Sequence, residues 1–120
     1  MASEGYHEPL ERLSEEVLER HRAITSLKEE LEAVDWYDQR VDASANEELR
    51  AVLAHNRDEE KEHAAMALEW LRRNDAKWDE VLRTYLFKEA PITEIEKEAD
   101  AAGDAPADLT VGDLRKEPPR

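Results

Sequence analysis

Cysteine is absent from this chain of 120 residues, so it can hold neither a disulfide framework nor a metal ion bound by thiolates. Glycine and proline are also scarce, with 3 and 5 residues, and neither occurs between Pro9 and Pro91. These two residue types are the strongest local breakers of helices. Their absence leaves the central part of the chain free to form long, uninterrupted helices.

The chain also lacks long apolar runs, and no segment has the length of a membrane span or of a secretory signal. We therefore expect a protein that stays in the cytoplasm. Charged residues make up 40% of the sequence, and the acidic ones dominate to give a net charge of -14. This excess argues against nucleic acid or an anionic membrane as a partner, and it favours the attraction of cations.

A first long amphipathic helix is predicted to follow Met1–His7, a segment without pattern that is expected to be mobile, and to reach Val41. Pro9 suits its first turn. Arg20 and Asp38 are the polar residues in an otherwise apolar seam. The apolar seam residues recur every three or four positions: Leu10, Leu13, Val17, Ile24, Leu27, Leu31, Val34 and Val41.

A short polar connection, Asp42–Asn46, leads into a second helix that we expect to run from Asn46 to Arg73. Ser44 or Asn46 can cap its first turn. A connection this short places the second helix antiparallel to the first. Such a chain is one domain at most, and a two-helix hairpin buries little apolar surface, so we expect self-association.

Shorter helical segments come next. Ala76–Phe87 carries a rich apolar stripe, and Pro91 begins another turn of helix. Around Gly103 the composition becomes that of a linker. We therefore divide the chain into a helical domain, residues 1–98, and a flexible tail, residues 99–120. The expected fold class is all-α, an antiparallel two-helix hairpin plus a short C-terminal helix.

The second helix carries polar residues where a buried stripe is expected, because its seam passes through Asn56, Glu60 and His63. Glu60 and His63 project from one face and can reach one metal ion, as in the Glu-x-x-His element of carboxylate-bridged di-iron bundles. The alternatives are a mis-phased seam and a buried hydrogen-bonded network. Folding the hairpin back places Glu30 opposite Glu60, so these three side chains are expected to converge.

Other acidic and aromatic residues line the first helix beside Glu30. Glu29, Glu32 and Trp36 share a strip next to the one that holds Glu30 and Tyr37. Ordinary solvated surface is the simpler interpretation of Glu29 and Glu32. An aromatic at the edge of the core, with its hydroxyl in water, is the simpler interpretation of Tyr37.

The tail contains an apolar island, Leu109–Arg115, with the sequence Leu-Thr-Val-Gly-Asp-Leu-Arg. A short motif on a flexible tether is a common way to dock into the groove of a partner. A solubilising tail with three chance aliphatic residues is the alternative.

Three stretches of the sequence together resemble the encapsulated ferritins, which are half-ferritins held inside encapsulin shells. These stretches are residues 29–43 (EELEAVDWYDQRVDA), residues 55–66 (HNRDEEKEHAAM) and residues 69–78 (EWLRRNDAKW). Leu109–Arg115 is also similar to the cargo-loading peptides of the type Leu-Thr-Val-Gly-Ser-Leu-Arg, with Asp113 where serine is usual.

The resemblance implies that Glu30, Glu60 and His63 bind iron, with Tyr37 beside the metal as a further catalytic residue. A ferritin-like di-iron bundle takes two Glu and two Glu-x-x-His sets from four helices, and this chain offers one of each on two helices. We therefore expect the hairpin to dimerise into a ferritin-like four-helix bundle, with two iron ions per dimer at a site across the subunit interface.

Two further metal sites are implied by the resemblance. One is an acidic uptake strip that leads to the irons and takes calcium or another divalent cation. The other is an outer site, for which a solvated charge cluster is the alternative. The uptake strip consists of Glu29 and Glu32 with Trp36 adjacent, and the outer site consists of His55, Glu59 and Glu62.

The same resemblance implies a decameric ring and capture by an encapsulin shell protein through Leu109–Arg115. The activity that it implies is that of a ferroxidase, which oxidises Fe(II) to Fe(III) with dioxygen and feeds iron mineralisation in the lumen of the nanocompartment. A non-catalytic iron-binding protein and a structural cargo protein are the alternatives.

Overall fold

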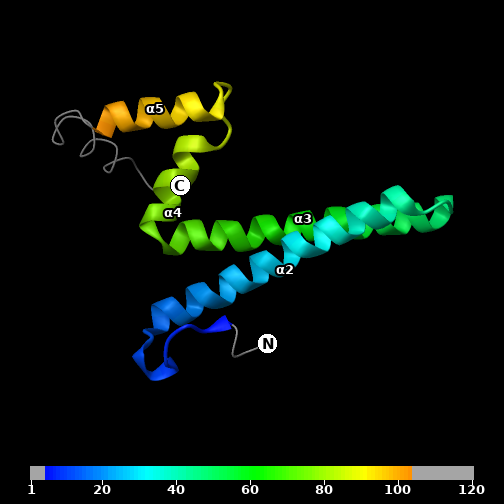
Figure 1. Ribbon diagram of the computed structural model, residues 1–120, viewed down its shortest axis with the longest axis horizontal. Helices are drawn as coiled ribbons and strands as arrows, with labels where there is room; N and C mark the ends of the chain where they lie inside the picture. Colours follow the sequence, from blue (N-terminus) through cyan, green and yellow to red (C-terminus); the bar gives the residue numbers. More distant parts are fainter. Residues whose placement is uncertain (1–4, 104–120) are drawn as a thin grey trace. The chain divides into compact units, whose positions relative to one another are not determined.

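The computed structural model of this protein describes residues 5–103, which contain helices and no strand (Figure 1). One compact unit ends at Ala76 and a second begins at Lys77. No helix among the described residues is long and apolar enough to cross a membrane. The elements are η1 (Leu10–Arg12), α2 (Glu15–Ala43), α3 (Glu47–Asn74), α4 (Ala76–Tyr85) and α5 (Ile92–Gly103).

The two long helices, α2 and α3, pack against each other as an antiparallel hairpin (Figure 1). Asn46 caps α3, because its Oδ1 atom accepts a hydrogen bond from the N–H of Leu49 at 2.9 Å. The Nε of Arg50 donates to the carbonyl oxygen of Val41 at 3.1 Å and ties the start of α3 to the end of α2. The all-α hairpin predicted from the sequence is therefore confirmed.

The first long helix begins later than predicted, and the expectation that Pro9 lies in its first turn is wrong. The carbonyl oxygen of Pro9 instead accepts the N–H of Arg12 in a 3-10 turn, and α2 begins at Glu15. Ser14 is the N-cap of α2, because its hydroxyl oxygen accepts a hydrogen bond from the N–H of Val17 at 3.2 Å. Its own backbone is extended, so the helix does not reach further towards Pro9. The glutamates that follow Ser14 favour a helix N-terminus electrostatically.

The short segment before η1 makes a specific contact with α2. The ring of Tyr6 lies on the ring of His21, with their centroids 4.5 Å apart. A methyl group placed on Gly5 would come within 3.3 Å of the same His21 ring. These residues are therefore packed on the helix, although their sequence carries no periodic pattern.

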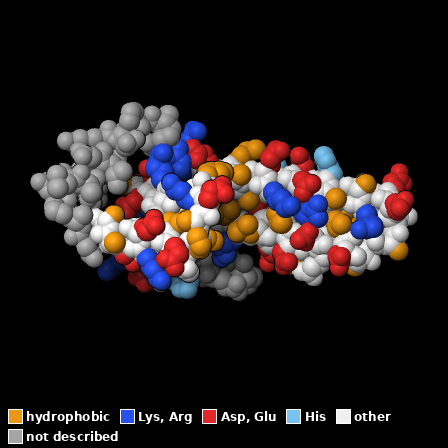
Figure 2. Space-filling view, turned by 90° about the horizontal axis from the view of Figure 1, so that it is seen from above, with side chains coloured by type: hydrophobic (Ala, Val, Ile, Leu, Met, Phe, Trp, Pro, Cys, Tyr) orange, Lys and Arg blue, Asp and Glu red, His pale blue; other side chains and the backbone are white. Residues whose placement is uncertain are grey.

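The hairpin leaves much of its apolar surface uncovered. Leu71 is the fully buried large side chain among the described residues, and Ala64 is 8% exposed. Hydrophobic side chains lie open between acidic and basic ones on the face drawn in Figure 2. The exposed large apolar residues of α2 and α3 include Val17, Ile24, Leu31, Leu49, Val52, Met66 and Trp70. Apolar surface on this scale is typical of a hairpin that packs against another element.

The second unit differs from the prediction at both helix ends. α4 ends at Tyr85, two residues before the predicted end at Phe87, because Phe87 has a left-handed φ of 60° that breaks the helix. α5 continues to Gly103, so the expected domain boundary at residue 98 falls inside a helix. The last turns of α5 are rich in alanine, the strongest helix former, which explains the extension.

Replacing Asn46 with alanine removes the cap of α3 and leaves the N–H of Leu49 without its side-chain acceptor. We expect Asn46→Ala to lower the free energy of unfolding by about 1 kcal/mol. The measurement is the melting temperature by circular dichroism at a constant protein concentration, since self-association would otherwise shift it. Asn46→Asp is the matched control, because aspartate can accept the same hydrogen bond. An unchanged melting temperature in Asn46→Ala would contradict this role of the cap.

Candidate metal centre

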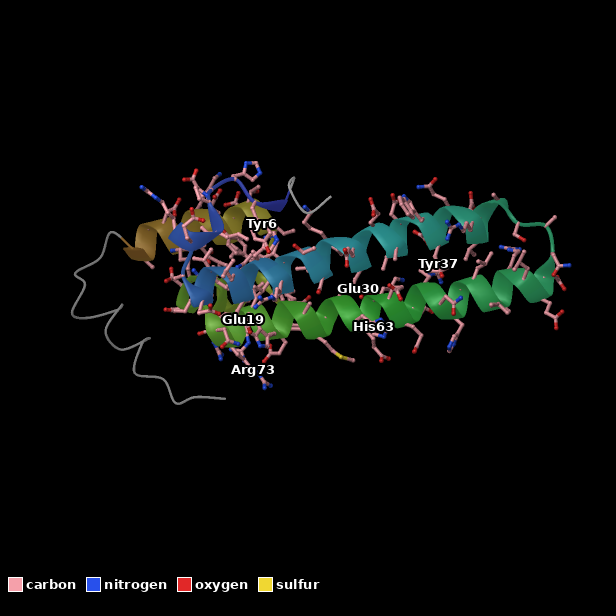
Figure 3. The ribbon with its side chains drawn as sticks, turned by 90° about the horizontal axis from the view of Figure 1, so that it is seen from below. Tyr6, Glu19, Glu30, Tyr37, His63 and Arg73 are labelled. Atoms are coloured by element: carbon pink, nitrogen blue, oxygen red, sulfur yellow. The ribbon has the colours of Figure 1, made fainter. Side chains whose placement is uncertain are left out.

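Three ligand-bearing side chains meet halfway along the hairpin. Glu30 projects from α2 and His63 projects from α3 (Figure 3). Glu60 also lies on α3, one turn before His63. The Nδ1 atom of His63 lies 3.5 Å from Oε2 of Glu30 and 3.5 Å from Oε1 of Glu60. The ligand atoms of all three lie within 4.8 Å of one another, and no other His, Asp and Glu side chains of residues 5–103 form such a group of three.

The two carboxylates of this group contact each other. The pKa of Glu60 is raised by a side-chain hydrogen bond with Glu30, by burial and by the negative charge of Glu30, while His63 lowers it. The Oε2 atom of Glu30 is buried and accepts no hydrogen bond from any residue in the described part of the chain. A buried carboxylate oxygen without a donor is costly. A cation bound between the side chains would supply the missing partner and stabilise the charged form of Glu60.

The group is open to solvent on one side. The side chain of His63 is 46% exposed, whereas those of Glu30 and Glu60 are 25% and 24% exposed. Two carboxylates and one imidazole suit iron and other first-row transition metals. They also make up half of the ligand set of a ferritin-like di-iron centre, which uses four carboxylates and two imidazoles. The open side is therefore where further ligands would have to approach.

Tyr37 lies seven residues beyond Glu30 on α2, about two helical turns away. Its side chain is half-buried, and the guanidinium of Arg40 lies over its ring at 5.3 Å from the centroid. This contact is a cation–π interaction, which holds the ring against its own helix. The placement of Tyr37 beside a metal stays a prediction.

The residues of the other two predicted sites lie on the surface of the hairpin. All six side chains are exposed, and those of the outer site do not form a group with converging ligand atoms in the single chain. Both sites stay predictions. They are Glu29, Glu32 and Trp36 for the uptake strip, and His55, Glu59 and Glu62 for the outer site.

Sequence reasoning missed the partners of the two polar seam residues of α2. Asp38 accepts a hydrogen bond from Arg57 at 2.9 Å, and Arg20 lies 3.8 Å from Asp75. The signal was present, since a charged residue in an apolar seam requires a partner of opposite charge. Arg57 lies one turn before Glu60, which brings this ion pair next to the candidate metal centre.

Comparison with known proteins places this chain in a family. Residues 5–89 match the EncFtn-like family. The chain is 74% identical over 103 residues to the "Encapsulated ferritin-like protein" of Rhodospirillum rubrum, covering 86% of this chain and 73% of that protein. It is 54% identical over 112 residues to the "Ferritin-like protein" of Thermotoga maritima, covering 93% of this chain and 95% of that protein.

A more distant relative and a solved structure agree with this placement. The chain is 35% identical over 104 residues to the "Encapsulin nanocompartment cargo protein EncC" of Myxococcus xanthus, covering 76% of this chain and 80% of that protein. The crystal structure of a protein from Nitrosomonas europaea has 62% sequence identity and a TM-score of 0.71, and the alignment covers 73% of this chain and 97% of that one. The chain belongs to the encapsulated ferritin family, the EncFtn-like family.

Proposed function

We propose that this protein is a ferroxidase, which oxidises Fe(II) to Fe(III) with dioxygen at a di-iron site shared between two copies of the chain. The convergence of Glu30, Glu60 and His63 carries the proposal, together with the buried Glu30 oxygen that has no hydrogen-bond donor among the described residues. Carboxylate and imidazole ligands suit iron. Membership of a ferritin-like family supports the same choice of metal.

A second copy of the chain would complete the site. Two chains related by a two-fold axis bring together four carboxylates and two imidazoles, which is the full ferritin-like ligand set for two irons. The same association would cover the exposed apolar side chains of α2 and α3. Both the ligand count and the uncovered apolar surface therefore support a homodimer, and we extend the proposal to a decameric ring of these dimers by resemblance.

Iron is the substrate of the proposed reaction. Carboxylates of Glu30 and Glu60 that bridge two Fe(II) ions would hold them close enough for each to give one electron to the same dioxygen molecule. The pKa of Glu60 is raised by Glu30 and by burial, and a bound cation would oppose that shift because it favours the charged carboxylate. His63 would supply a nitrogen ligand, and Tyr37 is proposed to lie beside the irons.

The uptake strip and the outer site belong to the proposal as secondary metal sites. Exposed carboxylates on a protein with a net charge of -14 raise the local concentration of cations. The strip would therefore deliver Fe(II) and could also hold calcium or another divalent cation. It comprises Glu29, Glu32 and the adjacent Trp36, and the outer site comprises His55, Glu59 and Glu62.

The proposed setting is the lumen of an encapsulin nanocompartment in the cytoplasm. The Rhodospirillum rubrum relative is named as encapsulated, and the Myxococcus xanthus relative is named as encapsulin cargo. We propose that Leu109–Arg115, which lies outside the described residues, binds the shell protein in this chain. The shell would then provide the container in which Fe(III) accumulates as mineral.

Removing any one ligand should abolish turnover, because each substitution removes two ligands from the shared site of a dimer. We expect Glu30→Ala, Glu60→Ala and His63→Ala each to lower the rate of oxygen uptake after addition of Fe(II) by about tenfold or more. Oxygen uptake is measured with an electrode on protein whose helicity has been checked by circular dichroism.

Glu48→Ala serves as the matched control for the two glutamate substitutions, because Glu48 is an exposed carboxylate in the first turn of α3. It should leave oxygen uptake at the parent rate. Parent-like uptake in all three ligand variants would disprove the site. Iron that binds to the parent without any oxygen uptake would instead identify a binding protein without ferroxidase activity.

The tail should be sufficient for binding to the shell protein without the helices. Each aliphatic side chain of Leu109–Arg115 that is buried in a shallow groove contributes about 1.5 to 3 kcal/mol before ordering costs. A single tail would therefore bind weakly, and a ring displaying several tails would bind through avidity. Deleting residues 109–120 should leave oxygen uptake intact and abolish capture by a co-expressed shell.

Fusing residues 104–120 to an unrelated soluble protein tests the tail directly. The fusion should co-purify with the shell protein after co-expression, and the same fusion without residues 109–115 is the control. If the fusion stays outside the shells while the full-length protein is encapsulated, the shell-binding segment lies in the helical part of the chain.

A further inference from the structure

Both polar residues of the α2 seam are paired across the hairpin. The Oδ1 atom of Asp38 lies 2.9 Å from Nη1 of Arg57 on α3. The Nε atom of Arg20 lies 3.8 Å from Oδ2 of Asp75, the residue that follows α3. The side chains of Arg57, Arg20 and Asp75 are 23%, 30% and 26% exposed, whereas that of Asp38 is 62% exposed. A charge at a seam position gives up an apolar contact, so two such positions on one helix call for an explanation.

The two pairs have the same spacing on both helices. Arg20 and Asp38 are 18 residues apart on α2, and Arg57 and Asp75 are 18 residues apart along α3. An interval of 18 residues is five turns of helix, so Arg20 and Asp38 lie on one face of α2, and Asp75 directly follows α3 about five turns beyond Arg57. Each helix therefore presents a positive charge first and a negative charge five turns later.

This order of charges favours the same antiparallel alignment that the short connection between Ala43 and Glu47 imposes. In the antiparallel hairpin, both contacts join opposite charges. In a parallel alignment, Arg20 would face Arg57 and Asp38 would face Asp75, and both contacts would be repulsive. A slip of seven residues would preserve an apolar seam but would move Arg57 about 10 Å away from Asp38.

The metal ligands cannot set this register themselves before metal binds. Glu30 and Glu60 bring two carboxylates together in the same seam, and their ligand atoms lie within 4.8 Å of one another. At this distance the two carboxylates cannot both be charged without repelling each other, so they do not by themselves favour the alignment that the metal needs. Arg57 lies one turn from Glu60, where an attraction to α2 opposes that repulsion most directly.

We propose that Asp38 and Arg57 are positioning residues, which together with the Arg20–Asp75 pair hold the hairpin in the register where Glu60 and His63 meet Glu30. The inference rests on the metal site of the proposed function. It goes beyond that function because it assigns the alignment of the ligands before metal binding to an ion pair that touches no metal. Partly exposed ion pairs add little net stability, so the contribution of this pair is the choice of register rather than the strength of the fold.

The test compares charge reversal with charge exchange, using the full chain and cobalt(II) as the probe. We expect Arg57→Asp and Asp38→Arg each to weaken the apparent cobalt affinity about threefold to tenfold, and the double variant to recover most of that loss. Recovery is incomplete because Arg57 also pairs with Asp58 at 3.1 Å, and the exchange does not restore that contact. Arg57→Asp is the decisive variant, because it makes the surroundings of the site more negative. If Arg57 acted only through the local field, this substitution would strengthen cation binding.

A matched exchange outside the hairpin controls for surface charge. Glu94 and Lys97 form an exposed ion pair within α5, and Glu94→Lys combined with Lys97→Glu should leave cobalt affinity unchanged. Arg57→Gln is the milder variant if Arg57→Asp loses helicity in circular dichroism, and it should also weaken binding.

The outcomes separate this inference from the proposed function. A parent that binds no cobalt overturns the metal site and the inference with it. A parent that binds cobalt overturns the inference alone if Arg57→Asp and Arg57→Gln bind as tightly or more tightly, or if the double exchange fails to restore binding. Loss in the single variants and recovery in the double variant, at equal helicity, supports it.

Discussion

The repulsion between two half-buried carboxylates governs this structure. Glu30 and Glu60 meet across the hairpin in a position that an ordinary two-helix seam would give to apolar residues. Two observations show that this arrangement is unfavourable without a further partner: the pKa of Glu60 is raised, and the buried Oε2 atom of Glu30 has no hydrogen-bond donor among the described residues. A cation is such a partner, because it turns two mutually repelling oxygens into ligands. The rest of the hairpin holds these oxygens together, which supports the proposal that they bind a metal ion.

A single hairpin has half of a di-iron ligand set and an uncovered apolar surface, and association with a second hairpin would complete both. Its ligand set is half of what a ferritin-like di-iron centre uses, and apolar side chains along both helices are exposed. Association of two hairpins would supply the missing ligands and cover the apolar surface together. The proposed dimer would therefore couple assembly to metal, since the carboxylates of the second chain add further repulsion until a cation lies between them. Folding, association and chemistry then depend on the same few side chains.

Sequence alone predicted the features that follow from helical periodicity. Glu60 and His63 share a face by their spacing, and folding the hairpin back brings Glu30 opposite them, as the structure confirms. The start of α2 could not be predicted by periodicity, because the apolar spacing continues through Ser14 while its side chain caps a new helix. The partner of Asp38 was also missed, since the contact depends on the reach of an arginine across the hairpin and on the exact crossing of two helices.

Native mass spectrometry of the protein titrated with Fe(II) in the absence of oxygen tests the central claim most directly, because it counts irons and chains in the same ion. The account predicts that iron appears in species with an even number of chains, at two ions per dimer, and that chelation shifts the population towards apo monomer. Monomers that bind iron as tightly as the dimers, or a distribution of chains identical with and without iron, would contradict a site completed by a second copy of the chain.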